Sequence, residues 1–282
     1  MPVDEIGKWS EDKLELLGKY LNAYTTIMRK QGWCKGYYYI DAFAGTGKPK
    51  ARDEDEERYI DGSPRRALDL KNPFTRYIFI EKEDWRVDKL KELQKEFPEK
   101  NIVIERGDCN KVLPEKIFPL LPWESRKRAF LLLDPFGMDI AWEVIEQAAK
   151  LRTFEMVINF PVMAMNRSLP SDPARLGADT EQKVTRFWGE GSWKNLFYER
   201  RHDLFGPTVE RVRYTAESLS DLFREHRLRK VFKQVSAPLV MKNSKGASLY
   251  SLIYAGHNHT ARKIIGDIFE KYKKQWRTHC SD

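Results

Sequence analysis

The sequence has 282 residues, of which 41% are hydrophobic and 33% charged, and it carries a net charge of +8. This length provides one large domain or two small ones, and the hydrophobic share excludes a disordered chain. No apolar run approaches the roughly 20 residues of a membrane span, and no apolar signal core follows the first residue. We expect a soluble cytoplasmic protein, and its positive charge favours nucleic acid or another anionic partner.

The cysteines exclude two further classes of protein. Cys34, Cys109 and Cys280 are odd in number, far apart and in no CxxC spacing. This pattern fits neither a disulfide framework nor a cysteine-rich zinc site.

Up to Pro161, the chain alternates between helical patterns and short apolar strands. A first helix is expected to be capped by Ser10 and to end at Gly32, and the charged stretch 48–61 is expected to be a loop. The predicted strands are 37–43, 76–82, 101–108, 129–136 and 154–161. The predicted helices between them are 63–70, 84–97, 110–118 and 141–151. Strands that are apolar on both faces and alternate with helices indicate a parallel sheet covered by helices.

The order changes after Pro161. Residues 162–228 contain no convincing strand and two helical patterns, near 179–189 and 215–227. Two strands, 229–240 and 247–255, then precede a final helix over 259–277. We therefore predict an α/β domain made of residues 1–161 and 229–282, interrupted by a helical insertion at 162–228 that recognises a substrate or a partner.

The segment from Asp41 to Gly47 (DAFAGTG) follows the first predicted strand. Its two glycines let the backbone turn tightly and approach a ligand. A pair of glycines alone is a weak signal, but an acid heads this loop and another acid, Glu81, ends the second strand. In a nucleotide-binding fold of this kind, Glu81 can accept hydrogen bonds from both ribose hydroxyls. The alternative is a solvated glutamate at the end of a strand.

Three further strand ends carry polar groups. Asp108 can accept the amino group of an adenine or, equally, cap the helix that follows. Asp134-Pro135-Phe136-Gly137 ends the fourth strand, where its carboxylate can take a proton or hold an amino group while Phe136 stacks on a planar ring. The alternative is an ordinary turn. Asn159 ends the fifth strand at the same edge of the sheet.

Histidines and basic residues give weaker signals. His257 and His259 have metal-ligand spacing but no further ligands nearby in the sequence, so no metal is expected. Basic residues and aromatic residues interleave over 187–214, which is typical of nucleic-acid binding or of an insertion with its own core and a solvated basic face. The other basic clusters are Arg65-Arg66, Arg126-Lys127-Arg128 and 224–233.

The five alternating strands, the terminal antiparallel pair and the acid-headed glycine loop resemble the class I S-adenosylmethionine-dependent methyltransferase fold, over residues 36–161 and 229–277. The resemblance implies that Asp41, Phe43, Gly45 and Gly47 bind the methionine end of S-adenosylmethionine. It also implies that Glu81 binds the ribose and Asp108 the adenine edge. Asp134, Pro135 and Phe136 then stand in the place of the Asp-Pro-Pro-aromatic motif of amino-group methyltransferases, without its second proline.

The chain also resembles the three-Cys-motif partner protein (TcmP) family. The similar segments are Tyr39–Gly47, Asp61–Pro64 with Ala67-Leu68, Ile80-Glu81, Leu133–Gly137 and Tyr250–Gly256. This resemblance implies a separate partner protein that carries three cysteines.

We therefore predict an S-adenosylmethionine-dependent methyltransferase that acts on nucleic acid or a nucleotide-like substrate. The residues expected to contact that substrate are Arg200, Arg201, Arg211 and Arg213. The alternative is a binding module on the same fold that holds the cofactor or nucleic acid without transferring a methyl group. A dinucleotide-dependent oxidoreductase is disfavoured by the terminal antiparallel pair and by the lack of a full GxGxxG.

Overall fold

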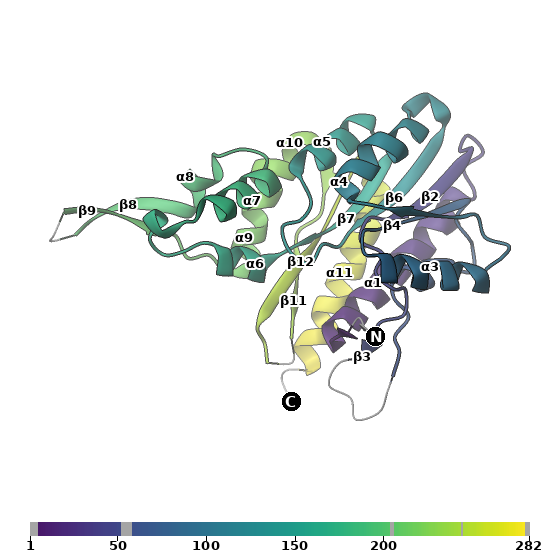
Figure 1. The fold of residues 1–282 in the computed structure, drawn as a ribbon, viewed down its shortest axis with the longest axis horizontal. Helices are drawn as coiled ribbons and strands as arrows, with labels where there is room; N and C mark the ends of the chain where they lie inside the picture. The colour runs from purple at the N-terminus through teal and green to yellow at the C-terminus, as the bar shows by residue number, and fades with distance from the viewer. Residues whose placement is uncertain (1–4, 52–57, 204–205, 244, 280–282) are drawn as a thin grey trace.

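The computed structural model describes residues 5–51, 58–203, 206–243 and 245–279, which form a central sheet with helices on both faces (Figure 1). Five parallel strands follow the order β5-β4-β2-β6-β7, and β12 pairs antiparallel with β7 on one side and with β10 and β11 on the other. This order confirms the predicted class I methyltransferase sheet. The strands of this sheet are β2 (Gly36–Asp41), β4 (Arg76–Glu81), β5 (Ile102–Arg106), β6 (Lys127–Leu133), β7 (Phe154–Phe160), β10 (Gln234–Val235), β11 (Leu239–Lys242) and β12 (Ser248–Gly256).

The two faces of the sheet bury separate hydrophobic cores, because neighbouring residues of a strand point to opposite faces. Tyr39 packs in the core beneath four helices, whereas Tyr38 and Ile40 belong to the core on the other face. The helices of the first face are α1 (Lys8–Met28), α2 (Ser63–Leu68), α3 (Asp84–Glu96) and α11 (His259–His279). Those of the second face include α4 (Cys109–Val112), α5 (Trp142–Leu151), α7 (Ala178–Trp188) and α9 (Ala216–Phe223).

The ends of α1 differ from the prediction. The helix begins at Lys8 with Gly7 as its N-cap, and the Gly7 carbonyl accepts a hydrogen bond from the Ser10 amide at 2.8 Å. Ser10 therefore lies inside the helix. The Trp9 ring packs so closely over Gly7 that a Cβ there would lie 2.3 Å from it. The helix ends at Met28, before Gly32.

Two other predicted segments are interrupted. The predicted strand 229–240 is divided into α10 (Arg229–Val231), β10 and the start of β11, and Pro238 lies between the two strands because it cannot donate a ladder hydrogen bond. In the predicted loop 48–61, β3 (Lys50–Ala51) pairs with β1 (Glu5–Ile6). Residues 52–57 of that loop lie outside the described residues.

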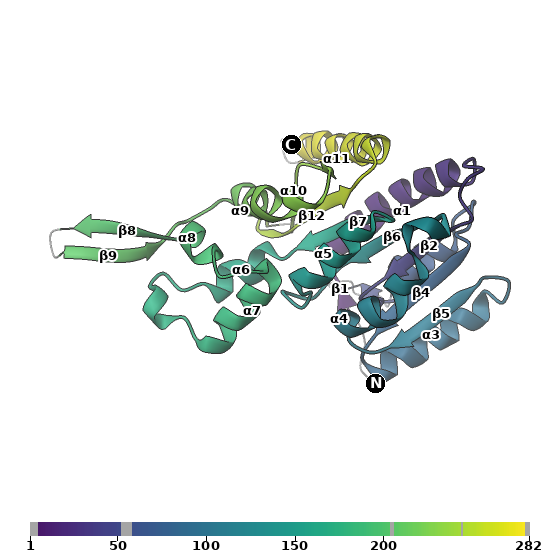
Figure 2. The same cartoon turned by 90° about the horizontal axis from the view of Figure 1, so that it is seen from above.

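The segment 162–228 is not purely helical, contrary to the prediction. It contains an antiparallel hairpin of β8 (Tyr198–Asp203) and β9 (Gly206–Arg211), which projects from the rest of the molecule in Figures 1 and 2. The other elements of this segment are α6 (Val162–Ser168), η4 (Pro173–Arg175), α7, α8 (Trp193–Phe197), α9 and η5 (Arg224–Leu228). The ring centroids of Phe223 in α9 and Phe160 in β7 are 5.2 Å apart. The helices of this segment therefore share one hydrophobic core with the sheet.

Within the described part of the chain, no helix is both long enough and apolar enough to cross a membrane. Cys34 and Cys109 are free thiols, and Cys280 lies outside the described residues.

A partly buried acid lies beneath α1. The Tyr20 hydroxyl donates to Glu155 Oε2 at 2.6 Å, and the Tyr254 ring lies 6.0 Å from the Tyr20 ring. Desolvation raises the pKa of Glu155 to about 7, since the one hydrogen bond from Tyr20 only partly offsets the cost of burying a charge.

The raised pKa of Glu155 makes stability depend on pH. The folded protein favours the protonated form of Glu155. The stabilisation that this gives is complete below the pKa that Glu155 has in the unfolded chain, and it is lost as the pH rises through about 7. We expect Glu155→Gln to remove roughly 2–3 kcal/mol of the fall in unfolding free energy between pH 5 and pH 8. Urea denaturation at both pH values measures this difference. The exposed Glu143→Gln serves as the control, and an equal pH dependence in all three proteins would contradict the assignment.

Candidate functional site at the carboxyl edge of the sheet

A cavity of about 640 Å³ opens where β2, β6 and β7 end, which is the edge at which open α/β sheets bind ligands. Its volume lies within the range of small-molecule sites, roughly 300–1,000 Å³. The loop after β2, the turn after β6 and the start of α6 line it, together with the first turns of α1 and the start of β12. Its lining includes Phe43, Gly45, Gly47, Asp134, Pro135 and Phe136 from the predicted site.

The glycine loop has a backbone that other residues would not tolerate. Gly45 and Gly47 have φ angles of 61° and 76°, in the left-handed region. The Gly62 amide donates to the Gly47 carbonyl at 2.9 Å, and a Cβ on Gly62 would lie 2.9 Å from that oxygen. A Cβ on Gly47 would lie 2.7 Å from Leu93 Cδ2 of α3. The loop is therefore fixed between α2 and α3.

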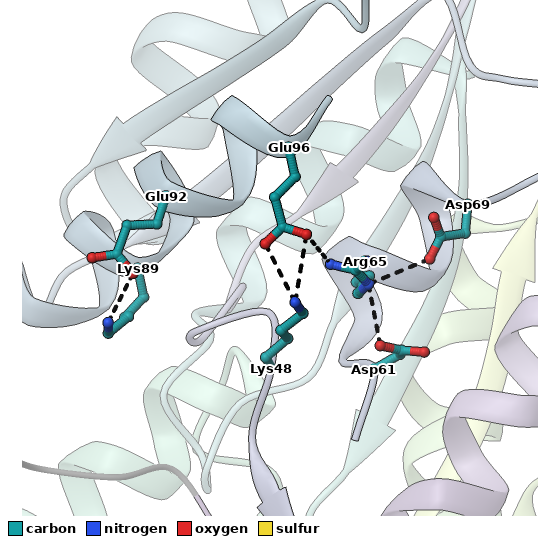
Figure 3. A network of polar contacts seen from close by, with 7 residues as sticks. All are labelled: Lys48, Asp61, Arg65, Asp69, Lys89, Glu92 and Glu96. Carbon is teal, nitrogen blue, oxygen red and sulfur yellow. Dashed lines mark hydrogen bonds and ion pairs between the residues drawn. The ribbon is translucent and has the colours of Figure 1, made fainter. Parts of the chain in front are cut away.

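Ion pairs hold the outer side of this loop (Figure 3). Arg65 of α2 reaches Glu96 of α3 at 2.5 Å and Asp61 at 3.2 Å, and Lys48 reaches Glu96 at 3.3 Å. The hydrogen bond from Arg65 is the main cause of the lowered pKa of Glu96. Arg65 thus contributes to an exposed ion-pair network that joins the loop to both helices.

Asp41 is fully buried and does not line the cavity. Its carboxylate accepts hydrogen bonds from the Tyr39 hydroxyl at 3.0 Å, from the Phe43 amide at 3.3 Å and from the Ser63 side chain. Desolvation raises its pKa to about 6, while these hydrogen bonds oppose the rise and nearby Asp134 adds to it. Asp41 therefore shapes the loop and the start of α2 from below.

Glu81 supports the loop from the neighbouring strand. Its Oε2 accepts from the Gly45 amide at 3.0 Å, and its Oε1 accepts from the amides of Lys82 and Glu83 at 2.8 and 3.1 Å. The residue is 6% exposed and is not part of the cavity lining. A carboxylate has about four acceptor positions, so three backbone donors leave room for one further hydrogen bond.

Asp108 caps α4, the alternative that the sequence left open. Its Oδ1 accepts from the Asn110 amide at 2.9 Å and from the Asn110 side chain at 2.8 Å. The residue is exposed and lies outside the cavity lining.

Asp134 lies between two groups that it contacts through different oxygens. Lys13 of α1 pairs with Oδ2, and the Asn159 side chain donates to Oδ1 at 2.6 Å. The Lys13 ammonium also lies 5.3 Å from the centre of the Tyr250 ring. Asn159 is 7% exposed, and its Oδ1 has no hydrogen-bond partner among the residues that the structure describes. The turn after β6 therefore places a carboxylate at the cavity wall, and the end of β7 places the Asn159 amide beside it.

Phe136 stands at the mouth of the cavity. It is 82% exposed, whereas the adjacent Pro135 is buried. Arg86 of α3 lies 5.3 Å from the Phe136 ring and 5.1 Å from the Trp85 ring, and its Nη1 is 3.9 Å from Glu81. A planar group entering the cavity would meet the Phe136 ring and the Arg86 guanidinium first.

The four arginines of the segment 198–213 have different environments. Arg211 donates to the carbonyls of Asn166 and Leu169 at 2.9 and 2.6 Å, so it closes the end of α6. Arg201 pairs with Glu199 at 2.5 Å. Arg200 and Arg213 are exposed and form no ion pair with the residues that the structure describes.

The two histidines do not form a metal site with other residues. His257 Nε2 lies 3.0 Å from the Ala149 carbonyl, and burial lowers its pKa. Among the residues that the structure describes, no three His, Cys, Asp or Glu side chains lie close enough to hold a metal ion.

Several lining residues carry no signal in the sequence. Lys13 is one of many charged residues on α1, Ser63 resembles an ordinary helix cap, and Tyr250 belongs to a strand far along the chain. Arg86 likewise reaches the cavity from α3, whose pattern indicates only a solvated face at that position, and Arg167 reaches it from α6, a helix that the sequence does not predict. Their role depends on tertiary contacts between α1, α3, α6 and β12.

Neither a protein-family model nor a curated protein matches the sequence. Solved structures match its fold at low identity. Protein LPL1258 from Legionella pneumophila str. Philadelphia 1 is 16% identical, with 86% of this chain and 96% of that chain covered and a TM-score of 0.44. The N-terminal domain of EvdMO1, solved in the presence of SAH and D-fucose, is 8% identical, with 86% of this chain and 82% of that chain covered and a TM-score of 0.42.

Aeropyrum pernix fibrillarin, solved with bound S-adenosyl-L-methionine, is 12% identical over 88% of this chain and 76% of that chain, with a TM-score of 0.38. The similarities concern the course of the chain alone. The assignment to the class I methyltransferase fold rests on the strand order, and the resemblance to the TcmP family stays a prediction.

The packing of the glycine loop predicts unequal effects of two alanine substitutions in one cavity wall. Gly47→Ala forces a positive φ on alanine and a contact with Leu93, so we expect a loss of roughly 1–3 kcal/mol in unfolding free energy. Gly137→Ala meets no atom within 4 Å, so we expect almost no loss. Urea denaturation compares the two variants, and equal stability would show that the loop is not tightly packed.

Proposed function

We propose that the protein transfers a methyl group from S-adenosylmethionine to a nucleic acid or a nucleotide-like substrate. The observation that carries the proposal is the glycine loop at the carboxyl edge, held by the Glu81–Gly45 hydrogen bond of 3.0 Å beside a cavity of about 640 Å³. Left-handed glycines let a ligand approach the backbone, and the carboxyl edge of a doubly wound sheet is the usual ligand site.

The residues present fit the cofactor in a specific way. Gly45, Gly47 and Phe43 line the cavity and would hold the methionine end, while the remaining acceptor position of Glu81 would take one ribose hydroxyl. Asp41 would act through the loop that it holds, without touching the cofactor. Asp108 lies outside the cavity lining, and it would accept the adenine amino group through the acceptor positions that its two bonds to Asn110 leave open. The cofactor supplies the electrophilic methyl group, so the protein's part is positioning.

Asp134 and Asn159 would position an amino group of the substrate. Asp134 Oδ2, now paired with Lys13, and the unpartnered Asn159 Oδ1 are acceptors in the same cavity wall. An exocyclic amine has two N–H donors, which would satisfy both oxygens. Phe136 would then stack on the ring that carries the amine, because its exposed face stands at the cavity mouth.

The hairpin would extend the substrate surface. Arg200 and Arg213 are exposed and would contact phosphates, while Arg211 would act indirectly by joining β9 to α6 at the cavity wall. We include in the proposal a partner protein with a three-cysteine motif, supported by the resemblance to the TcmP family.

A second candidate function is a binding module without methyl transfer. Lys13 occupies the Asp134 carboxylate at which the acceptor would be held, and the second proline of the amino-methyltransferase motif is missing. These two features favour a protein that binds the cofactor or nucleic acid on behalf of a partner.

The role of Glu81 predicts a loss of cofactor binding. We expect Glu81→Gln to weaken S-adenosylmethionine binding by roughly 1.5–3 kcal/mol, about 10- to 100-fold, because a charged acceptor and the support of the Gly45 amide are lost together. Equilibrium dialysis with the labelled cofactor measures the affinity. Glu83→Gln, on the exposed neighbour, is the matched control. Equal affinity of the wild type and Glu81→Gln would remove Glu81 from the site.

The role of Asp134 predicts a separation of binding from transfer. We expect Asp134→Asn to retain cofactor binding and to lower methyl transfer by about 100-fold or more, the scale for a positioned acid or base. The assay follows tritiated methyl groups from S-adenosylmethionine into single-stranded DNA and RNA. Exposed Asp139→Asn is the control. Cofactor binding without transfer by the wild type would favour the binding module.

A further inference from the structure

A second cluster of aromatic and basic residues lies at the opposite, amino edge of the sheet. The Arg128 guanidinium lies 4.6 Å from the centre of the Trp33 ring and 4.1 Å from that of the Trp123 ring. The Arg152 guanidinium lies 5.7 Å from the centre of the same Trp123 ring. Both tryptophans are solvent-exposed, at 44% and 52%. The seven residues of β6 separate this edge from the cavity by about 20 Å, at roughly 3.3 Å per residue.

Six basic residues gather along the starts of four adjacent strands, β4, β2, β6 and β7. They are Lys35, Arg76, Arg126, Lys127, Arg128 and Arg152. The Lys35 amide donates to the Arg126 carbonyl at 2.9 Å, and both Arg76 and Lys127 lie over the Tyr38 ring, at 5.6 and 5.8 Å. Within the described ranges, none of the six forms an ion pair with a carboxylate, in contrast to Arg65, Lys48 and Arg201. This amino-edge cluster therefore carries positive charge that no carboxylate among the described residues neutralises by an ion pair.

Two of these arginines have an unfavourable backbone conformation. Arg126 and Arg152 have φ angles of 54° and 58°, and they are the non-glycine residues with positive φ among those described. Left-handed backbone is less favourable for arginine than for glycine, because the Cβ lies too close to the following carbonyl oxygen. A favourable contact with the dipole of α5 offsets part of this cost for Arg152, but Arg126 follows only a short 3₁₀ turn. Stability alone thus does not account for arginine at both positions.

We propose that the amino-edge cluster binds single-stranded nucleic acid, separately from the cavity at the carboxyl edge. The unpaired basic groups would hold phosphates, and the exposed faces of Trp33 and Trp123 would stack on bases, the combination by which single strands are bound without sequence preference. Only unpaired bases expose faces for stacking, which favours a single strand over a duplex. This site requires neither the cofactor nor the hairpin arginines.

The test measures fluorescence anisotropy of fluorescein-labelled (dT)20 and U20 without cofactor, as a function of salt. In R126G/R152G, glycine accepts both backbone conformations, so the fold is retained. We expect the affinity for the oligonucleotides to fall about 10-fold or more at 50 mM salt. We also expect the slope of log K against log salt to become shallower by about 1.4, because each of the two lost phosphate contacts contributes roughly 0.7. K89Q/K91Q on α3 removes the same charge elsewhere and is the matched control. Equal affinity and slope in R126G/R152G and the wild type would overturn the proposal.

A second comparison separates stacking from charge. We expect Trp123→Leu to weaken binding of the oligonucleotides several-fold but to leave binding of inorganic polyphosphate unchanged. An equal loss for both ligands, or no loss for either, would overturn the stacking part. R200Q/R213Q, on β8 and just after β9, is expected to leave the effect of R126G/R152G intact. If neither oligonucleotide binds the wild type, the proposal fails and an acidic protein becomes the partner to seek.

Discussion

The geometry of the candidate site depends on the hydrogen bond between the Glu81 carboxylate and the Gly45 amide. It joins the end of β4 to the loop that follows β2, across two neighbouring strands of the sheet. Because the loop contains two left-handed glycines, its own backbone preferences do not fix it. A nearly buried acid from the next strand supplies the constraint that local sequence lacks.

Charge neutralisation organises the same edge of the sheet. Asp41 is fully buried, and desolvation raises its pKa to about 6, with a further contribution from nearby Asp134. Lys13 balances Asp134 from α1, while Tyr39, Ser63 and the Phe43 amide satisfy Asp41. Displacing Lys13 would expose Asp134 to a new donor. The interaction that stabilises this edge is thus also the one that a substrate amine would have to replace.

The sequence predicted the sheet because its strands are apolar on both faces and alternate with helices whose periodicity differs from theirs. It also predicted which loops meet at the carboxyl edge, and Phe43, Gly45, Gly47, Asp134, Pro135 and Phe136 do line the cavity. The hairpin β8–β9 escaped detection because it projects into solvent, as Figure 2 shows, and because Tyr198 at its base is the one buried side chain among those described in the two strands.

The supporting roles within the site were equally hidden. Glu81 and Asp41 follow strands as expected, but only tertiary structure shows that their oxygens accept hydrogen bonds from the backbone and lie outside the cavity lining. The contact between Lys13 and Asp134 joins residues 121 positions apart, for which local spacing gives no signal. Likewise, Arg211 looked like a phosphate ligand, yet its guanidinium is occupied by carbonyls of α6.

The central claim is that this edge of the sheet holds S-adenosylmethionine. Calorimetric titration of the wild-type protein with S-adenosylmethionine and, separately, with NAD tests it most directly. We expect saturable, micromolar binding of S-adenosylmethionine and no binding of NAD. Binding of NAD alone, or of neither compound, would contradict it.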